Sequence, residues 1–333
     1  MPGLTRRLLL AVLATLAPAV AASPAGAAGH ATSIARATTA ANVGIVDIYT
    51  TLGYENGVAA GTGMILSHSG EVLTNNHVIR GATKFKVVDV TTHRTYPATV
   101  VGYSVSRDVA VLQLAQASRL KTIRLGASVP LRVGQQVVAR GNAQGLGGAP
   151  KEARGRVTAL HRQIVARDES GGSETLTNLI ATDAPVVPGD SGGPLEDARN
   201  RAVGMVTAGS TAGIRRGFAI PIRQALVYAR LIMKGKSSAT VHVGQTAFLG
   251  VNLSDASGGA RVMEVIQGKA ADAAGLVAGD VITSLNGSSI SSSADIRTVV
   301  LTLVPGTSVA IEWTDANGNA QTGSITPTSG PPQ

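Results

Sequence analysis

Short apolar runs separated by turn-forming residues are the feature that most constrains the fold of residues 41–221. The runs span residues 44–50, 58–67, 84–90, 109–114, 136–140, 156–166 and 202–208. Strands at this spacing, without helical periodicity between them, are typical of all-β barrels and sandwiches and argue against a parallel βαβ sheet. Because aromatic residues make up only 3% of the chain, Val, Leu, Ile and Ala must fill the core.

The pattern changes after Pro221. Apolar residues then recur at helical spacing over residues 222–233, and proline is tolerated in the first turn of a helix. The sequence therefore predicts a helix that closes a first domain of residues 41–236. With 333 residues, the chain is long enough for a second compact domain.

A small polar stretch, GKSSAT, then marks a domain boundary near residue 238, and we expect a linker over residues 237–243. Two strands, a short helix near residues 269–274, another strand, a helix near residues 292–303 and final strands follow. This order predicts a separate α+β domain over residues 244–328. We expect the tail, residues 329–333, to be disordered.

The N-terminus is typical of an export signal. Arg6 and Arg7 precede an apolar stretch over residues 8–22, and the small residues 25–27 (AGA) fit a cleavage site. We expect cleavage after Ala27, with cleavage after Ala22 as the alternative, and a flexible segment over residues 28–40. An uncleaved membrane anchor is disfavoured because a membrane-spanning helix needs about 20 apolar residues. Sec and twin-arginine export both remain open.

The charge and cysteine content exclude several classes of function. The chain has no cysteine, so its cores must hold by packing alone. Its net charge of +9, or +7 without Arg6 and Arg7, is spread without a basic cluster or interleaved aromatic residues, which argues against nucleic-acid binding. Loose association with an acidic surface, or solubility alone, accounts for such a charge. We predict no cofactor, and no His/Asp/Glu cluster has the spacing of metal ligands.

Three segments supply the side chains that nucleophilic acyl transfer requires. Ser191 lies in the glycine-rich heptapeptide GDSGGPL, His77 lies in LTNNHVI, and Asp108 lies in SRDVAVL before an apolar run. A serine activated by a histidine, whose tautomer an aspartate fixes, is the arrangement that peptide hydrolysis uses. Each segment alone is open to a structural reading, but the chain order His, Asp, Ser is that of the chymotrypsin-type triad. The other histidines lack such a context, and we expect structural roles for them: His30, His68, His93, His161 and His242.

These segments resemble the HtrA family of trypsin-like proteases. Further landmarks of the resemblance are GTG at residues 61–63, GNA at 141–143, TDA at 182–184 and GFAIP at 217–221, so that it covers nearly all of residues 43–225. The short loops, the export signal and a single PDZ module are similar to the exported actinobacterial branch of the family that includes PepA.

The resemblance implies a double β-barrel with the triad in the cleft between the barrels. His77 and Asp108 would come from the first barrel and Ser191 from the second. The oxyanion hole would use the backbone N–H groups of Gly189 and Ser191, with that of Asp190 adjacent. Many family members have Asn where this chain has Asp190, and in trypsins an Asp there pairs with a newly cut N-terminus. The route of activation is therefore left open.

The residues before the nucleophile predict the primary specificity pocket. Where trypsins place an acid, six residues before the nucleophile, this chain has Pro185, followed by Val186 and Val187. An apolar, shallow pocket is expected, with cleavage after Val, Ala or Leu.

The second domain carries a peptide-binding signature. Phe248, Leu249, Gly250 and Val251 resemble the carboxylate-binding loop of a PDZ domain, and residues 268–282 resemble the helix and strand that follow it in bacterial PDZ domains. Successive N–H groups of such a loop receive a terminal carboxylate while the peptide adds as an extra strand. The expected partners are therefore peptide C-termini.

Together these features predict an exported serine endopeptidase that acts on unfolded or damaged polypeptides. The alternative is a peptide-binding chaperone or scaffold whose triad is latent or inactive. Homotrimers are common in the family, and Tyr49 and Tyr54 are the N-terminal aromatic residues that such an assembly would use, although a core role fits them equally well.

Overall fold

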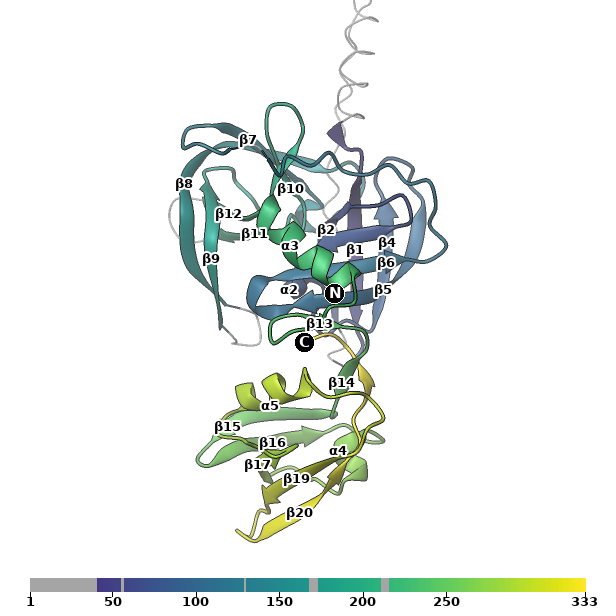
Figure 1. Ribbon diagram of the computed structural model, residues 1–333, viewed down its shortest axis with the longest axis vertical. Helices are drawn as coiled ribbons and strands as arrows, with labels where there is room; N and C mark the ends of the chain where they lie inside the picture. Colours follow the sequence, from purple (N-terminus) through teal and green to yellow (C-terminus); the bar gives the residue numbers. More distant parts are fainter. Residues whose placement is uncertain (1–40, 55–56, 129, 168–172, 211–215) are drawn as a thin grey trace, which may run out of the picture. The chain divides into compact units, whose positions relative to one another are not determined.

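The computed structural model describes residues 41–54, 57–128, 130–167, 173–210 and 216–333, which Figure 1 draws as a ribbon. The expected signal peptide, its cleavage sites and the flexible segment 28–40 lie outside the described residues. Within the described residues, no helix is both long and apolar enough to span a bilayer.

Six strands of the first half close into a barrel. In spatial order they are β5 (Thr95–Ser104), β4 (Lys84–Asp89), β1 (Ile45–Leu52), β2 (Gly57–Ile65), β3 (Glu71–Thr74) and β6 (Val109–Leu114), and β6 pairs back to β5. Buried aliphatic residues such as Ile48, Ile65 and Leu112 fill its interior together with Tyr103. The one-turn helix α2 (Asn76–Ile79) follows β3, and the 3-10 turn η1 (Val105–Arg107) precedes β6.

A second closed barrel follows, visible beside the first in Figure 1. Its strands in spatial order are β10 (Pro194–Glu196), β11 (Ala202–Ser210), β12 (Arg216–Pro221), β9 (Ser173–Thr182), β8 (Lys151–Arg167) and β7 (Gln136–Gly141). The 3-10 turn η2 (Ala143–Gly145) follows β7. The predicted all-β double barrel is confirmed, and each of the seven apolar runs falls on a strand. The seven runs do not include β3, β5, β9, β10 and β12, which are either short or rich in polar residues and proline.

Helix α3 (Ile222–Met233) begins directly after Pro221, as the sequence predicts. Its buried face consists of Ile222, Ala225, Leu226, Ala229 and Ile232. This face packs against residues of both barrels, including Val111 and Met205, so the helix belongs to the same core as the strands.

The segment expected to be a linker is part of the first sheet. Strand β13 (His242–Val243) pairs antiparallel with β5, with His242 opposite Tyr103 and Val243 opposite Gly102. Gly102 makes this pairing possible, because a Cβ at that position would collide with the His242 carbonyl oxygen. The free backbone edge of β5 is a tertiary feature that the polar composition of the segment does not indicate.

The C-terminal domain has its own sheet and core. The sheet runs β15 (Val251–Ala256), β16 (Gly259–Val265), β17 (Val281–Leu285), β19 (Val309–Thr314), β20 (Ala320–Ile325), with β18 (Ser288–Ser289) paired to β17. Helices α4 (Ala270–Ala273) and α5 (Ser293–Val300) complete the predicted α+β module, and a capping box of Ser292 and Asp295 begins α5. Strand β15 forms one edge of the sheet, where a further strand can add.

The expectation of a disordered tail was wrong. Strand β21 (Thr328–Gly330) pairs antiparallel with β14 (Thr246–Phe248), and Pro331 and Pro332 are buried. A short segment of small residues and proline has no local signal for order, so its structure depends on partners elsewhere in the chain.

Candidate active site

Helix α2 places His77 against the carboxylate of Asp108. The His77 backbone N–H donates to Asp108 Oδ1 at 3.0 Å, and His77 Nδ1 lies 3.0 Å from both carboxylate oxygens. The imidazole is 37% exposed, whereas the Asp108 side chain is 2% exposed. The bond at Nδ1 leaves Nε2 as the basic nitrogen, which is the tautomer that a general base requires.

Asp108 is held from both barrels. It occupies the left-handed region at φ 51°, which aspartate tolerates, directly after η1. Its carbonyl oxygen accepts a hydrogen bond from Asn75 Nδ2 at 2.9 Å. On the other side Thr207 Oγ1, from strand β11, donates to Asp108 Oδ2. The carboxylate is therefore fixed by groups far apart in the sequence.

These surroundings set the protonation of His77. Burial lowers the pKa of the imidazole. The negative charge of Asp108 and its hydrogen bond together raise the pKa by more, so that it lies above its ordinary value. Arg80 and Glu174, which form an ion pair beside the ring, act in opposite directions on this pKa.

Thr207 connects Ser191 to the Asp108 carboxylate. The Ser191 hydroxyl donates to the Thr207 carbonyl oxygen at 3.4 Å, and the Thr207 hydroxyl donates to Asp108. The Ser191 carbonyl oxygen accepts from Thr62 N at 2.8 Å, which connects the Ser191 segment to the first barrel. Gly192, at φ 84°, allows this approach because a Cβ there would collide with the Thr62 carbonyl oxygen.

The turn before Ser191 presents two free backbone N–H groups. Pro188 O accepts from Gln144 N at 2.7 Å, and because a trans peptide points its C=O and N–H in opposite directions, the Gly189 N–H faces away from Gln144. Within the described residues, neither Gly189 N nor Ser191 N donates a hydrogen bond, whereas Asp190 N donates to Val187 O at 3.1 Å. The Asp190 N–H is therefore committed to the turn.

The side chain of Asp190 also closes this turn. Its Oδ2 accepts from Val187 N at 2.9 Å, while its buried Oδ1 has no partner among the described residues. Burial raises the pKa of the Asp190 carboxyl, and the hydrogen bond from Val187 lowers it by less. Within the described residues, no ammonium group pairs with this carboxylate.

Comparisons with known proteins agree with this geometry. A family profile described as a trypsin-like peptidase domain matches residues 61–205, and one described as a PDZ domain matches residues 247–322. Serine protease PepD of Mycobacterium tuberculosis is 36% identical over 303 residues, which cover 85% of this chain and 63% of PepD. The chain belongs to the HtrA-type family of trypsin-like serine proteases.

Two other relatives support the family assignment. The periplasmic pH-dependent serine endoprotease DegQ of Escherichia coli is 36% identical over 266 residues, which cover 75% of this chain and 55% of DegQ. The solved structure of the HtrA-type protease AlgW with a tripeptide has a TM-score of 0.51 and 28% identity, covering 89% of this chain and 98% of that structure. The HtrA-type chain described here thus spans little more than half of DegQ and under two thirds of PepD.

The residues predicted to line the specificity pocket of this HtrA-type chain separate in the structure. Pro185 is exposed, whereas Val186 is half-buried. The Val186 side chain lies next to Gly209 of strand β11 and Gly217 of strand β12. A Cβ built on Gly209 would lie 3.2 Å from Val186 Cγ2, and one built on Gly217 would lie 3.0 Å from it. An apolar side chain therefore faces two positions without side chains, and Pro185 is not part of that contact.

The PDZ domain presents its predicted loop next to the edge strand β15. The Leu249 carbonyl oxygen accepts from Ala271 N and the Gly250 carbonyl oxygen from Ile266 N, each at 2.8 Å. Within the described residues, the N–H groups of Leu249 and Gly250 make no hydrogen bond. Gly250, at φ 78°, has no room for a Cβ against Lys269. Phe248 stacks on Tyr54 with ring centroids 4.9 Å apart.

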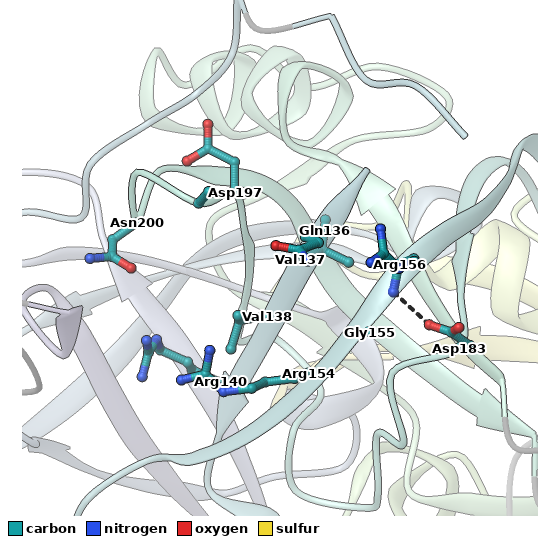
Figure 2. Close-up of a pocket in the computed structure, with 11 residues that line it drawn as sticks. Gln136, Val137, Val138, Arg140, Arg154, Gly155, Arg156, Asp183, Asp197 and Asn200 are labelled. Carbon is teal, nitrogen blue, oxygen red and sulfur yellow. Dashed lines mark hydrogen bonds between the residues drawn. The ribbon is translucent and has the colours of Figure 1, made fainter. Parts of the chain in front are cut away.

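The protease domain also contains a polar surface pocket that lies outside this site. It has a volume of about 640 Å³ and is lined mainly by strands β7 and β8, with Arg140, Arg154 and Arg156 (Figure 2). Two of its arginines form ion pairs: Arg140 with Glu152 and Glu196, and Arg154 with Glu152. Since none of His77, Asp108 and Ser191 lines it, we assign it no part in the candidate active site.

Sequence patterns did not indicate the residues that connect the candidate triad. Thr207 joins Ser191 to Asp108, and Thr62 Oγ1 donates to the Gly189 carbonyl oxygen at 2.7 Å. The threonine of GTG at residues 61–63 belonged to a recognised landmark, but neither threonine has a local signal that distinguishes it from a strand residue.

Proposed function

We propose that this chain is an exported serine endopeptidase that cleaves unfolded or damaged polypeptides through an acyl-enzyme. The observation that carries the proposal is the hydrogen-bonded arrangement of His77, Asp108 and Ser191 around Thr207. It unites a nucleophile, a base with a fixed tautomer and a buried acid, the three parts that the chemistry needs.

In the proposed reaction, the Ser191 hydroxyl turns from the Thr207 carbonyl oxygen to His77 Nε2, which takes its proton as Oγ attacks the substrate carbonyl. Asp108 stabilises the imidazolium that forms. The free N–H groups of Gly189 and Ser191 stabilise the developing oxyanion, and His77 then protonates the leaving amine. Water, activated in the same way, releases the acyl group from Ser191.

The substrate preference that we propose rests on Val186. An apolar side chain beside Gly209 and Gly217 offers no charge to a Lys or Arg side chain and favours small or medium aliphatic residues at the cleaved position. Unfolded polypeptides expose such residues, which folded proteins bury.

The PDZ domain is proposed to capture peptide C-termini. The free N–H groups of Leu249 and Gly250 and the edge strand β15 supply the two parts of strand-addition recognition. Helix α5 borders the same strand, since Ser293 N donates to Asp255 Oδ1 at 2.8 Å.

Export and assembly are further parts of the proposal. The basic residues, apolar stretch and AGA sequence at the N-terminus support secretion or attachment to the cell envelope, with cleavage after Ala27. The relative DegQ is a periplasmic serine endoprotease. A homotrimer is proposed from the family resemblance, and the contact of Tyr54 with Phe248 within the chain does not require one.

A latent peptide-binding protein is the second candidate function. The observation that favours it is the Ser191 hydroxyl, which donates to Thr207 O in the structure. If the serine stayed in this position with substrate bound, the chain would bind unfolded polypeptides without cleaving them. Turnover of an unfolded protein such as casein by the purified chain separates the two candidates.

Peptide binding is expected to depend on the terminal carboxylate. In the Ser191→Ala chain, which cannot degrade the ligand, a hydrophobic-ended peptide should bind with a Kd in the micromolar range, about 8 kcal/mol at 1 µM. Its C-terminal amide should bind at least about tenfold more weakly, because it brings no negative charge to the loop N–H groups. Fluorescence anisotropy with both peptides measures the difference.

The matched variant for this test is Gly250→Ala. Its Cβ has no room against Lys269 and its φ is positive, so the loop should distort and binding of the acid should fall to that of the amide. Gly258→Ala, another glycine at positive φ but with open space around it, is the control. Equal affinities for acid and amide would contradict the carboxylate-loop assignment.

Activity is expected to rise with pH as His77 loses its proton. Because Asp108 holds the pKa of His77 above its ordinary value, the acidic limb of kcat/KM should have its midpoint above about 6.5. Below that pH the imidazolium cannot accept the Ser191 proton. Hydrolysis of a chromogenic peptide across the range of about pH 5 to about pH 9 gives the midpoint.

A chelator serves as the control, since EDTA should leave this profile unchanged. Activity that EDTA abolished and zinc restored would contradict the mechanism, as would an optimum near pH 5, about where the imidazole is fully protonated.

A further inference from the structure

The segment after β21 contacts both ends of the helix that carries His77. The Gln333 carbonyl oxygen accepts from Asn76 Nδ2 at 3.0 Å, and the Pro332 carbonyl oxygen accepts from Gly81 N at 2.9 Å. Asn76 directly precedes His77, and Gly81 lies two residues beyond the end of α2. Two hydrogen bonds to the carbonyl oxygens of neighbouring tail residues thus bracket the single turn that holds the proposed base.

Helix α2 has little local stabilisation of its own. One turn of helix is unstable in isolation, because the first hydrogen bond must offset the ordering of several residues. Its N-cap residue, Asn75, makes no side-chain cap and instead donates to the Asp108 carbonyl oxygen. The orientation of α2 therefore depends on contacts from outside the helix.

The tail is itself anchored at a defined place. Gly330 stands opposite Thr246 in the β14–β21 pair and approaches Phe248 so closely that a Cβ would collide with it. The Gln333 N–H donates to Tyr103 Oη at 3.2 Å, and the same hydroxyl lies 3.0 Å from Thr246 Oγ1. Tyr103 is fully buried, so this anchor does not move independently of the first barrel.

The two prolines of the tail suit its burial. Pro331 and Pro332 are both buried, and proline has no N–H group that burial would leave without a partner. Their fixed φ also reduces the conformational entropy that the tail loses on docking. The tail therefore presents carbonyl acceptors to α2 at a low cost in conformational entropy.

We propose that residues 330–333 are a positioning segment that holds α2, and with it His77, in register with Asp108 and Ser191. The inference rests on the proposed peptidase function. The segment touches neither substrate nor reacting atoms and acts through Asn76 and Gly81. Because β21 pairs with β14, which leads into the loop of Leu249 to Val251, it also joins the peptide-binding domain to the base.

The test compares chains that keep or lose these bonds. Deletion of residues 331–333 removes both acceptors, and Tyr103→Phe removes only the hydroxyl that anchors Gln333. The matched control is Gln333→Ala, because the hydrogen bonds that Gln333 makes to other described residues use its backbone N–H and carbonyl. For the deletion we expect kcat to fall about tenfold with KM within about twofold, since misplacement of a catalytic group affects the chemical step.

Tyr103→Phe should show a smaller loss of kcat, and Gln333→Ala none. The amidated peptide Ser-Gly-Pro-Pro-Gln, added at about millimolar concentration, should restore kcat of the deleted chain, whereas the amidated sequence Gln-Pro-Gly-Pro-Ser should not. The amide is used so that the peptide does not occupy the carboxylate loop. Folding of each variant is checked by its thermal unfolding midpoint.

A second readout separates this inference from the proposed function. In the ¹⁵N-histidine-labelled chain, the His77 imidazole resonances, assigned with His77→Gln, should change in chemical shift and pKa on deletion and return with the peptide. If the intact chain hydrolysed nothing, the peptidase proposal would fail and these resonances would still test the segment. Unchanged kcat and unchanged His77 resonances in the folded deletion variant would overturn the inference.

Discussion

Ser191→Ala is expected to lower kcat for hydrolysis of casein or a peptide by about a thousandfold or more, since loss of a triad nucleophile leaves only binding and the oxyanion donors. The substitution removes one hydroxyl whose bond in the structure goes to a carbonyl oxygen, and the flanking glycines keep the turn. Thermal stability and peptide binding by the PDZ domain should therefore stay within experimental error of the intact chain.

Ser237→Ala is the control for this variant, because Ser237 is exposed and distant in sequence from the triad segments. Both proteins are purified in the same way, and a fluorophosphonate probe reports whether residue 191 is labelled. Residual hydrolysis within about tenfold of the intact chain would remove Ser191 from its proposed role.

Asp108→Asn is expected to reduce kcat by up to about 10⁴-fold at neutral pH with little change in KM. The carboxylate oxygens accept bonds from the His77 backbone, the His77 ring and the Thr207 hydroxyl. An amide in this place presents an NH₂ group to some of these donors and favours the wrong imidazole tautomer. It also removes the charge that raises the pKa of His77, so the acidic limb of the pH profile should move to lower pH.

Asp89→Asn is the matched control. Asp89 is a buried carboxylate of the same barrel, and its Oδ1 accepts backbone bonds from Thr91 and Thr92 rather than from the triad. The Asp89→Asn substitution should lower the free energy of unfolding without a comparable loss of kcat. If both substitutions lowered kcat equally among folded molecules, Asp108 would have no special part in the reaction.

The sequence by itself determined the features that depend on local pattern. Short apolar runs and the turn residues between them marked seven strands, and helical spacing after Pro221 predicted the bounds of α3. The heptapeptide around Ser191 and the segments around His77 and Asp108 identified the candidate triad, because a nucleophile on a tight turn needs glycines beside it. Such signals lie within a few residues of each other and can be recognised without a fold.

Tertiary structure alone decided the contacts between distant segments. Thr207, which also accepts the bond from Ser191, meets Asp108 across 99 residues of sequence, and Asn76 meets Gln333 across 257. Strand β13 and the tail were expected to be linker and disordered chain because their small, polar and proline residues lack an apolar period. Their order comes from backbone groups that find partners on β5, β14 and α2, and hydrogen bonds of this kind leave no trace in local composition.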